Sequence, residues 1–314
     1  MRICSFLPSA TEIVFALGLG DQLCGVTQGC DYPAEAQTKP VVVRSILDGQ
    51  DLSSAEIDRI VMEHFQRGES VYRIDLDGLR AAAPDLILTQ ELCDVCAVGY
   101  QDVLSQVKSL PKVPQVLSLS PQTLEDVLHD MLKVGETTGA SERATAAVMS
   151  FRQRIENVRQ RAALAAMRPR VFCLEWVDPL FVSGHWVSEM IDIAGGTDGL
   201  GDRHTPSRRI TWERVREYQP EVVVLLPCGF DTPRTLRELE ALWTLSGWPE
   251  LPAVRASRVY AVNGGAYFSR SGPRLVDGLE LLAQIVHPEL FPWTATDEMA
   301  VRVRGPGMVR EVPA

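Results

Sequence analysis

The sequence lacks several features that would place it in other classes of protein. None of its segments approaches the ~18 unbroken apolar residues of a membrane-spanning helix. The net charge of −10 argues against a nucleic-acid partner, which requires a basic face. The motifs of nucleophile elbows, phosphate-binding loops and dinucleotide-binding turns are also missing. We therefore expect a binding protein rather than an enzyme, with no nucleic acid among its partners and no membrane-embedded segment.

Cysteine is too scarce for a disulfide scaffold. The 314 residues contain seven cysteines, an odd number at low density, which indicates free thiols in a reducing compartment. The N-terminal stretch MRICSFLPSATEIV has one basic residue, and a polar PSATE segment follows where a secretory apolar region would run. We see no lipidation motif in it. These observations predict a cytoplasmic protein, or a periplasmic one only if the N-terminus was trimmed.

What the sequence does contain is an alternation of strand and helix patterns. On both sides of a long helical pattern at 141–167, short apolar runs alternate with amphipathic segments, as in parallel sheets covered by helices. At 1.5 Å per residue this helix would be roughly 40 Å long, enough to span two lobes. We predict an α/β protein with a first lobe at 1–140, a linking helix at 141–167, a second lobe at 168–290 and an unpatterned tail at 291–314.

Two segments repeat the same order of elements. DGLRAAAPDLILTQELC and TWERVREYQPEVVVLLPCG each read as a helix, a proline followed by an acid, a buried strand and a cysteine. This echo between Pro84–Cys93 and Pro220–Cys228 predicts two lobes of related design. Ligands of open α/β sheets sit beyond the carboxyl ends of the strands. We therefore expect these ends, and the loop EWVDPLFVSGHW, to face one cleft between the lobes.

Several motifs carry a family resemblance. The opening ICSFLPSATEIVFALGLGDQLCGVTQGCDYP resembles that of the periplasmic-binding-protein family that serves iron-siderophore, haem and vitamin B12 importers. The similarity is greatest to the cobalamin-binding receptors. In the second half, RVFCLEWVDPLFVSGHWVSEMIDIAGG and GAYFSRSGPRLVDGLELLA look like the family's strand–loop–helix unit and its final pocket loop. The resemblance covers roughly residues 1 to 288.

The resemblance implies two Rossmann-like lobes with parallel sheets, joined by one long rigid backbone helix that resists hinging. Members of the family hold bulky, flat metal chelates between the lobes. They are exported or lipid-anchored, whereas this chain shows no export signal. Importer receptors also dock on a membrane permease through an exposed acid on each lobe. In the first lobe that position falls near Gly99 and Tyr100, and Asp102 is the nearest acid.

Aromatic and polar side chains gather in the loops after the predicted strands. Pockets are lined mainly by apolar and aromatic groups with a few placed polar ones. We predict that residues of both lobes contact the ligand, namely Tyr32, Cys93, Cys96, Trp176, His185, Trp186, Cys228, Tyr267, Phe268 and Arg270. For the aromatic residues among them, core packing is the alternative. Glu12 and Asp31 are interpreted as a helix-start acid and a turn acid.

Cys93 and Cys96 form the single C-x-x-C motif of the sequence, and three roles are possible for them. A zinc site would need two further ligands, but the five histidines form no H-x-x-x-H pair. A redox pair usually opens a helix that lowers the thiol pKa, and Asp94 works against this. We favour a pocket wall. His185 is a candidate cobalt ligand, because imidazole suits borderline metals, with a hydrogen-bonded loop residue as the alternative.

These observations predict a binding protein for a corrinoid, a cobalamin-like metal chelate, as ligand and no catalytic cofactor. It would act as the solute-binding component of an importer, with an ABC permease as partner, or as an intracellular carrier. Haem or a ferric siderophore is the alternative ligand. An anionic siderophore would want several converging cations, and only Arg270 and Arg44 are candidates. The alternative from another class is a metalloenzyme that uses Cys93, Cys96 and His185.

Overall fold

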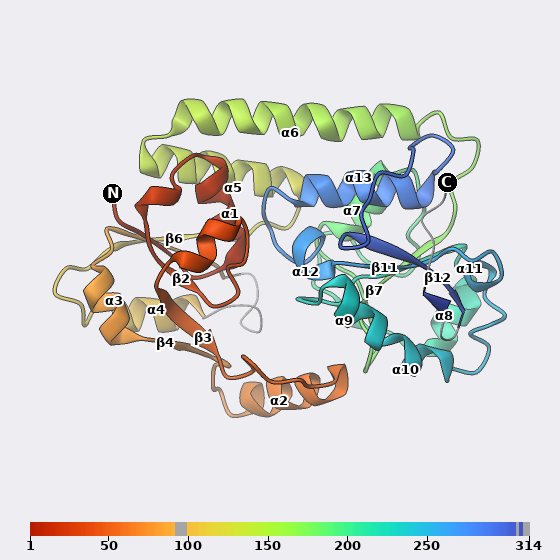
Figure 1. Cartoon of the computed structure of the whole chain (residues 1–314), viewed down its shortest axis with the longest axis horizontal. Coiled ribbons are helices and arrows are strands. Elements are labelled where there is room, and N and C mark those ends of the chain that lie inside the picture. The colour runs from red at the N-terminus through yellow and green to blue at the C-terminus, as the bar shows by residue number, and fades with distance from the viewer. Residues whose placement is uncertain (92–98, 306–307, 310–314) are drawn as a thin grey trace.

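A computed structural model describes residues 1–91, 99–305 and 308–309 of the chain. It has two α/β lobes that lie side by side, with the long helix α6 (Ser141–Ala162) running across both (Figure 1). This confirms the predicted fold class of two lobes joined by a long helix.

The first lobe is built on a mixed sheet in the order β4-β3-β2-β1-β5-β6. Its strands pair in parallel except for β3 and β4, which are antiparallel at one edge. The strands are β1 (Ile3–Ser5), β2 (Leu23–Thr27), β3 (Val41–Ser45), β4 (Tyr72–Ile74), β5 (Leu86–Thr89) and β6 (Gln115–Ser118). The helices are α1 (Pro8–Ala16), α2 (Ser54–Gln66), α3 (Leu76–Ala82), α4 (Tyr100–Val107) and α5 (Leu124–Thr138), with 3₁₀ turns at Gly20–Gln22 and Ala34–Thr38.

The second lobe is built on a sheet in the order β13-β12-β11-β10-β7-β8-β9. Its centre, β7, β10 and β11, is parallel, and both edges are antiparallel. The strands are β7 (Val171–Trp176), β8 (Phe181–Val182), β9 (Arg208–Arg209), β10 (Val222–Leu225), β11 (Val259–Val262), β12 (Ala300–Gly305) and β13 (Met308–Val309). The helices are α7 (Val187–Ile193), α8 (Trp212–Tyr218), α9 (Thr232–Arg237), α10 (Leu239–Trp243), α11 (Pro252–Arg255), α12 (Gly264–Tyr267) and α13 (Leu275–Val286).

The C-terminal segment differs from the expected unpatterned tail. Residues Ala300–Gly305 form β12, which pairs antiparallel with β11, and Val303 is buried in the core of the second lobe. The stretch from Val301 to Arg304 alternates apolar and charged residues, which is the period of a half-exposed strand. The expectation is therefore wrong for this segment, which completes one edge of the sheet.

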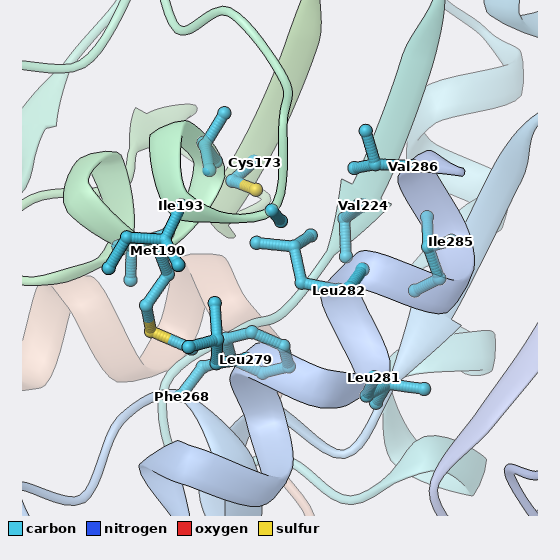
Figure 2. Close-up of a cluster of buried hydrophobic side chains, with 14 of the residues drawn as sticks. Cys173, Met190, Ile193, Val224, Phe268, Leu279, Leu281, Leu282, Ile285 and Val286 are labelled. Atoms are coloured by element: carbon cyan, nitrogen blue, oxygen red, sulfur yellow. The ribbon is translucent and has the colours of Figure 1, made fainter. Parts of the chain in front are cut away.

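One of the two hydrophobic clusters of the second lobe lies between its sheet and helices α7 and α13 (Figure 2). Met190 and Ile193 come from α7, Leu279 and Leu282 from α13, and Val224 from the central strand β10. All of these side chains are almost fully buried. Burial of each such side chain contributes roughly 1.5–3 kcal/mol of hydrophobic free energy, so this layer fixes the positions of the strand ends.

Helix α6 connects the hydrophobic cores of both lobes. Ile155 packs against the clusters of the first and the second lobe alike. Arg154, one residue earlier, forms ion pairs with Asp277 and Glu280 of α13. The helix ends at Ala162, before the predicted Met167, with basic residues in its last turn where they complement the helix dipole. The two lobes are therefore joined along one side by a packed helix.

A segment of the first lobe reaches the second lobe on the opposite side. Residues 46–70, here called the arm, connect β3 to the antiparallel strand β4 and contain α2. Ser53 and Glu56 form a capping box at the start of α2, which satisfies its free backbone N–H groups. In Figure 1 the arm lies across from α6, next to α9 and α10. The lobes thus meet at α6, at the strand ends and at the arm.

Candidate ligand-binding site

The strand ends of the two lobes are joined by a cluster of four charged side chains. Glu12 on α1 accepts hydrogen bonds from Arg270 at 3.1 Å and from Arg274 at 2.6 Å. Arg270 also donates two hydrogen bonds to Asp31, which lies after β2. The acids belong to the first lobe and the arginines to the second. We call this group, Glu12, Asp31, Arg270 and Arg274, the interlobe ion cluster.

In this cluster, burial and the neighbouring charges have opposite effects on the pKa values. The Glu12 side chain is only 2% exposed, whereas that of Asp31 is 58% exposed. Burial would lower the pKa of Arg270, but the carboxylates of Asp31 and Glu12 outweigh it and raise that pKa above its usual value. Burial likewise raises the pKa of Asp31, but hydrogen bonds and charge from Arg270 dominate, and the net pKa is lowered. Both pKa shifts favour the charged forms of Arg270 and Asp31.

Two tyrosines from different lobes flank the cluster. The Arg274 guanidinium lies 4.2 Å from the ring centroid of Tyr32 and 5.7 Å from that of Tyr267. A cation over an aromatic face is attracted by the ring quadrupole. Tyr32 is 50% exposed and Tyr267 is half-buried. The structure thus brings three predicted site residues together, namely Tyr32, Tyr267 and Arg270.

Trp176 joins the second lobe to the arm. Its indole N–H donates to the backbone oxygen of Ser54, at 3.2 Å, and its ring lies 5.2 Å from that of Phe230. Cys228, half-exposed beyond β10, donates its backbone N–H to Glu175 beside Trp176. Trp176 and Cys228 therefore lie on the ends of the adjacent strands β7 and β10.

His185 forms a third contact between the lobes. Its backbone is left-handed, with φ of 51°, and its Nδ1 lies 3.2 Å from the Gln122 side-chain oxygen of the first lobe. Burial lowers the pKa of His185, so the ring is neutral at pH 7. A neutral imidazole whose Nδ1 donates to an oxygen presents Nε2 as the metal-binding atom.

Trp186 and Phe268 occupy the core. They are 3% and 2% exposed, and both belong to the hydrophobic cluster of the second lobe. The Trp186 indole N–H donates to the backbone oxygen of Phe268 at 2.8 Å, which satisfies the buried donor. The Trp186 ring also stacks on His185. We therefore leave Trp186 and Phe268 out of the ligand surface that we propose, and treat them as support for His185 and Tyr267.

Cys93 and Cys96 lie in residues 92–98, outside the part of the chain that the structure describes. Their role stays a prediction. Within the described residues, no group of three or more His, Cys, Asp or Glu side chains could hold a metal ion.

Two cavities border the arm. One, of about 500 Å³, lies between the arm and α9–α10 and is lined by side chains of both lobes, among them Asp51, Glu56, Arg234 and Glu238. The other, of about 470 Å³, lies within the first lobe between the arm and the start of α4. The first is lined largely by polar or charged groups, and the second by apolar and polar groups together. Among the residues that the structure describes, no member of the predicted site lines either cavity.

Sequence reasoning missed the partners of Arg270. Glu12 was interpreted as a helix-start acid, but it is a buried ion-pair partner, and α1 has no acid in its first turn. Asp31 was interpreted as a turn acid and forms the other half of the cluster. A signal was available, because Glu12 stands directly before the apolar run IVFAL at 13–17 and a buried charge requires a counter-charge. Its partners lie 258 and 262 residues away, a separation that the local pattern does not encode.

In the described part of the chain, no helix is long and apolar enough to cross a membrane. What the arrangement offers is a surface between two lobes, lined by aromatic rings, one neutral imidazole and a charge-balanced ion cluster. Such a surface suits the binding of a bulky ligand better than acid–base or nucleophilic chemistry.

Comparisons with known proteins agree with this geometry. The sequence profile described as periplasmic binding protein matches residues 3–264. An uncharacterized ABC transporter substrate-binding lipoprotein, YvrC of Bacillus subtilis, is 26% identical over 296 residues, which cover 92% of this chain and 81% of that protein. The vitamin B12-binding protein of Vibrio cholerae is 26% identical over 289 residues, covering 89% and 86%.

Solved structures show the same fold. A periplasmic heme binding protein from Pseudomonas aeruginosa superposes with a TM-score of 0.70 at 23% identity, over 93% of this chain and 95% of that one. At this identity the likeness concerns the fold, and it extends over both lobes.

Proposed function

The chain belongs to the periplasmic binding protein family and is a substrate-binding protein of the ABC-transporter type, and on this premise we propose that its ligand is a corrinoid held between the lobes. The family resemblance noted in the sequence is thereby confirmed. Members are binding proteins and not enzymes, so the metalloenzyme alternative is dropped. The ligand class is supported by near full-length similarity to a vitamin B12-binding protein.

The observation that carries the choice of ligand is the charge balance of the interlobe ion cluster. Its two arginines are already paired with two carboxylates, Glu12 and Asp31. Arg44, the other cationic candidate, pairs with Asp48 and is 62% exposed. An anionic chelate would either draw the arginines away from the two carboxylates or be repelled by those carboxylates. A neutral corrinoid with an amide rim can hydrogen-bond to the cluster without displacing a charge.

Aromatic side chains supply the contact area in this proposal. Tyr32, Tyr267 and Trp176 lie at strand ends of the two lobes and are not fully buried. His185, neutral and half-buried, is the proposed axial ligand of cobalt. Cys228 remains a contact candidate beside Trp176, and Cys93 and Cys96 remain predicted members of the pocket wall.

Calorimetric titration with cyanocobalamin, hydroxocobalamin and haem tests the ligand. We expect one-to-one binding of both corrinoids and weaker binding of haem. Hydroxocobalamin, whose axial water is exchangeable, should show a visible spectral shift that His185→Ala removes, while cyanocobalamin affinity stays unchanged. Tighter binding of haem than of either corrinoid would contradict the proposal.

Trp176→Ala tests the position of the site. Loss of the indole should weaken corrinoid binding by about tenfold or more, equivalent to ~1.4 kcal/mol, with little change in the thermal midpoint. Trp248→Phe is the control, because the Trp248 ring is fully buried in a hydrophobic cluster of the second lobe outside the proposed site, and its change should affect stability and not affinity. Equal affinity losses in the two variants would place the ligand elsewhere.

Haem is the second candidate ligand, and the neutral imidazole of His185 is the observation that favours it. Imidazole ligates haem iron in many proteins, so a haem complex of this chain should show a His-dependent Soret shift. The same titrations separate the two ligands.

The compartment and the permease are further parts of the proposal. The cytoplasmic location predicted from the N-terminal sequence would make the protein a carrier, and an exported form would make it the receptor of an importer. Fractionation of the native cells, with immunodetection of the chain, distinguishes these two roles.

A further inference from the structure

Two thiols of the first lobe lie close together, and neither belongs to the proposed ligand site. The Sγ atoms of Cys4 on β1 and Cys24 on β2 are 3.7 Å apart. Both cysteines are free in the structure. We propose that Cys4 and Cys24 are a redox-sensitive pair that closes to an intramolecular disulfide when a peroxide oxidises the protein.

The backbone brings the two side chains onto one face of the sheet. β1 and β2 are parallel neighbours, and the register passes from Ile3 opposite Leu23 to Cys4 opposite Gly25, so Cys24 is the additional residue of a bulge. Both thiols pack into the same apolar cluster. Adjacent strands lie about 4.8 Å apart, within the roughly 4.4–6.8 Å that a disulfide requires between Cα atoms.

Gly25 leaves room for this contact. A Cβ atom at position 25 would lie 2.7 Å from the Cys4 sulfur, closer than any side chain tolerates. The glycine therefore allows the Cys4 side chain to cross to β2 and face Cys24.

The two thiols differ in the way a reactive and a resolving cysteine differ. Cys24 is half-exposed, and the hydrogen bond from Cys4 lowers the pKa of Cys24 to about 7. The positive charge of Arg2 acts in the same direction. Cys4 is fully buried, and its bond to Cys24 together with burial raises its pKa. Cys24 is thus the thiolate that an oxidant reaches first.

The reaction balances without a further reactant. The Cys24 thiolate attacks one oxygen of hydrogen peroxide, the O–O bond breaks, and a proton and the departing hydroxide form water. The Cys24 sulfenic acid is then attacked by the Cys4 sulfur, which loses its proton, and the hydroxyl group leaves as a second water. Two thiols are oxidised to one disulfide, and one peroxide is reduced to two waters.

The neighbouring cysteine Cys30 provides the matched control. It lies in the apolar cluster on the other face of the sheet, 3% exposed, with its sulfur 3.1 Å from the Thr11 hydroxyl. Burial raises the pKa of Cys30, which disfavours its thiolate. It shares the N-terminal region with the pair but should not react.

Peptide mapping after oxidation tests the proposal. The full-length protein is reduced, freed of reductant, treated with hydrogen peroxide under native conditions, and alkylated in denaturant. Cleavage before aspartate separates residues 1–20, with Cys4, from residues 21–30, with Cys24 and Cys30. We expect these two peptides to be joined, with Cys30 alkylated, in wild type, in Cys30→Ser and in Cys93→Ser with Cys96→Ser. Cys24→Ser should lose the link.

The proposal is overturned if Cys4 remains fully alkylatable after the treatment. It is also overturned if the link involves Cys30, or if Cys24 is found only as a sulfinic or sulfonic acid. Since the wild-type map alone decides between these results, the test does not depend on the folding of any variant.

Discussion

Glu12 places a carboxylate that is 2% exposed between the two lobes, where it forms ion pairs with Arg270 and Arg274 of the other lobe. Removing one member of a buried, hydrogen-bonded ion group leaves the rest uncompensated, which typically costs about 3 kcal/mol or more. We therefore expect Glu12→Gln to lower the free energy of unfolding in urea by about 3 kcal/mol. Glu35→Gln, at an exposed position, should change it little. Equal effects would mean that the cluster is not a stabilising contact.

The pH dependence of stability should report Asp31, the exposed member of the same cluster. Because Arg270 depresses its pKa in the folded state, Asp31 stabilises the fold above its unfolded pKa of about 3.9. This stability is lost as the pH falls below about 4 through the lowered folded pKa. We expect Asp31→Asn to be less stable than wild type at pH 7, and the difference to vanish at about pH 2. A constant difference across this range would exclude Asp31 as the source.

At the scale of the element, the arm is held to the second lobe mainly by polar contacts. Arg234 of α9, whose side chain is 17% exposed, donates to the backbone oxygen of Leu52 and pairs with Glu238 at 2.9 Å. Glu238 in turn accepts from the Ser54 hydroxyl at 2.7 Å. Arg237 and Asp51 form a parallel pair that is largely exposed, with side chains 57% and 79% accessible. Buried charged hydrogen bonds contribute more than exposed pairs.

Arg234→Ala should therefore loosen the arm. The Trp176 indole N–H, which donates to Ser54 in the arm at 3.2 Å and to Asp178 in its own loop at 3.1 Å, provides the readout by NMR hydrogen exchange. We expect its exchange to become about tenfold faster, since a charged hydrogen bond contributes roughly 1.5 kcal/mol. Arg237→Ala should change the rate about twofold or less. If both variants exchange alike, the arm is held by other contacts.

Some helices and strands could be predicted from the sequence, and others could not. Both copies of the helix, proline–acid and strand pattern were predicted, because β5 and β10 are apolar runs bounded by Pro84 and Pro220. Strand β12 was not predicted although its residues alternate at a period of two, because this pattern does not indicate which strand β12 pairs with. The ion cluster was missed for a related reason, because burial of Glu12 depends on a lobe that begins far along the chain. The local sequence pattern therefore predicts helices and strands, whereas the site depends on contacts between residues that are far apart in the chain.

At the scale of the molecule, the described residues couple the lobes at four places at least, through α6, through the interlobe ion cluster, through the arm and through the contact of His185 with Gln122. Ile155 packs against one hydrophobic cluster of each lobe, so these two clusters are not independent. An arrangement of this kind favours small relative motion of the lobes and a single cooperative unfolding transition. It also explains why the strand ends stay aligned across the interface that we propose as the ligand site.

The placement of tryptophan allows this cooperativity to be measured. All six tryptophans lie at position 176 or later, in the second lobe, so their fluorescence reports that lobe, whereas far-ultraviolet circular dichroism reports both. We expect the two signals of the wild type to coincide in urea. Ile155→Ala combined with Glu12→Gln weakens the couplings through α6 and through the ion cluster and should separate the two signals, with circular dichroism changing first as the first lobe unfolds. Val148→Ala, which affects the first-lobe cluster alone, should shift the curves together. Separate curves in the wild type would show that the lobes fold independently.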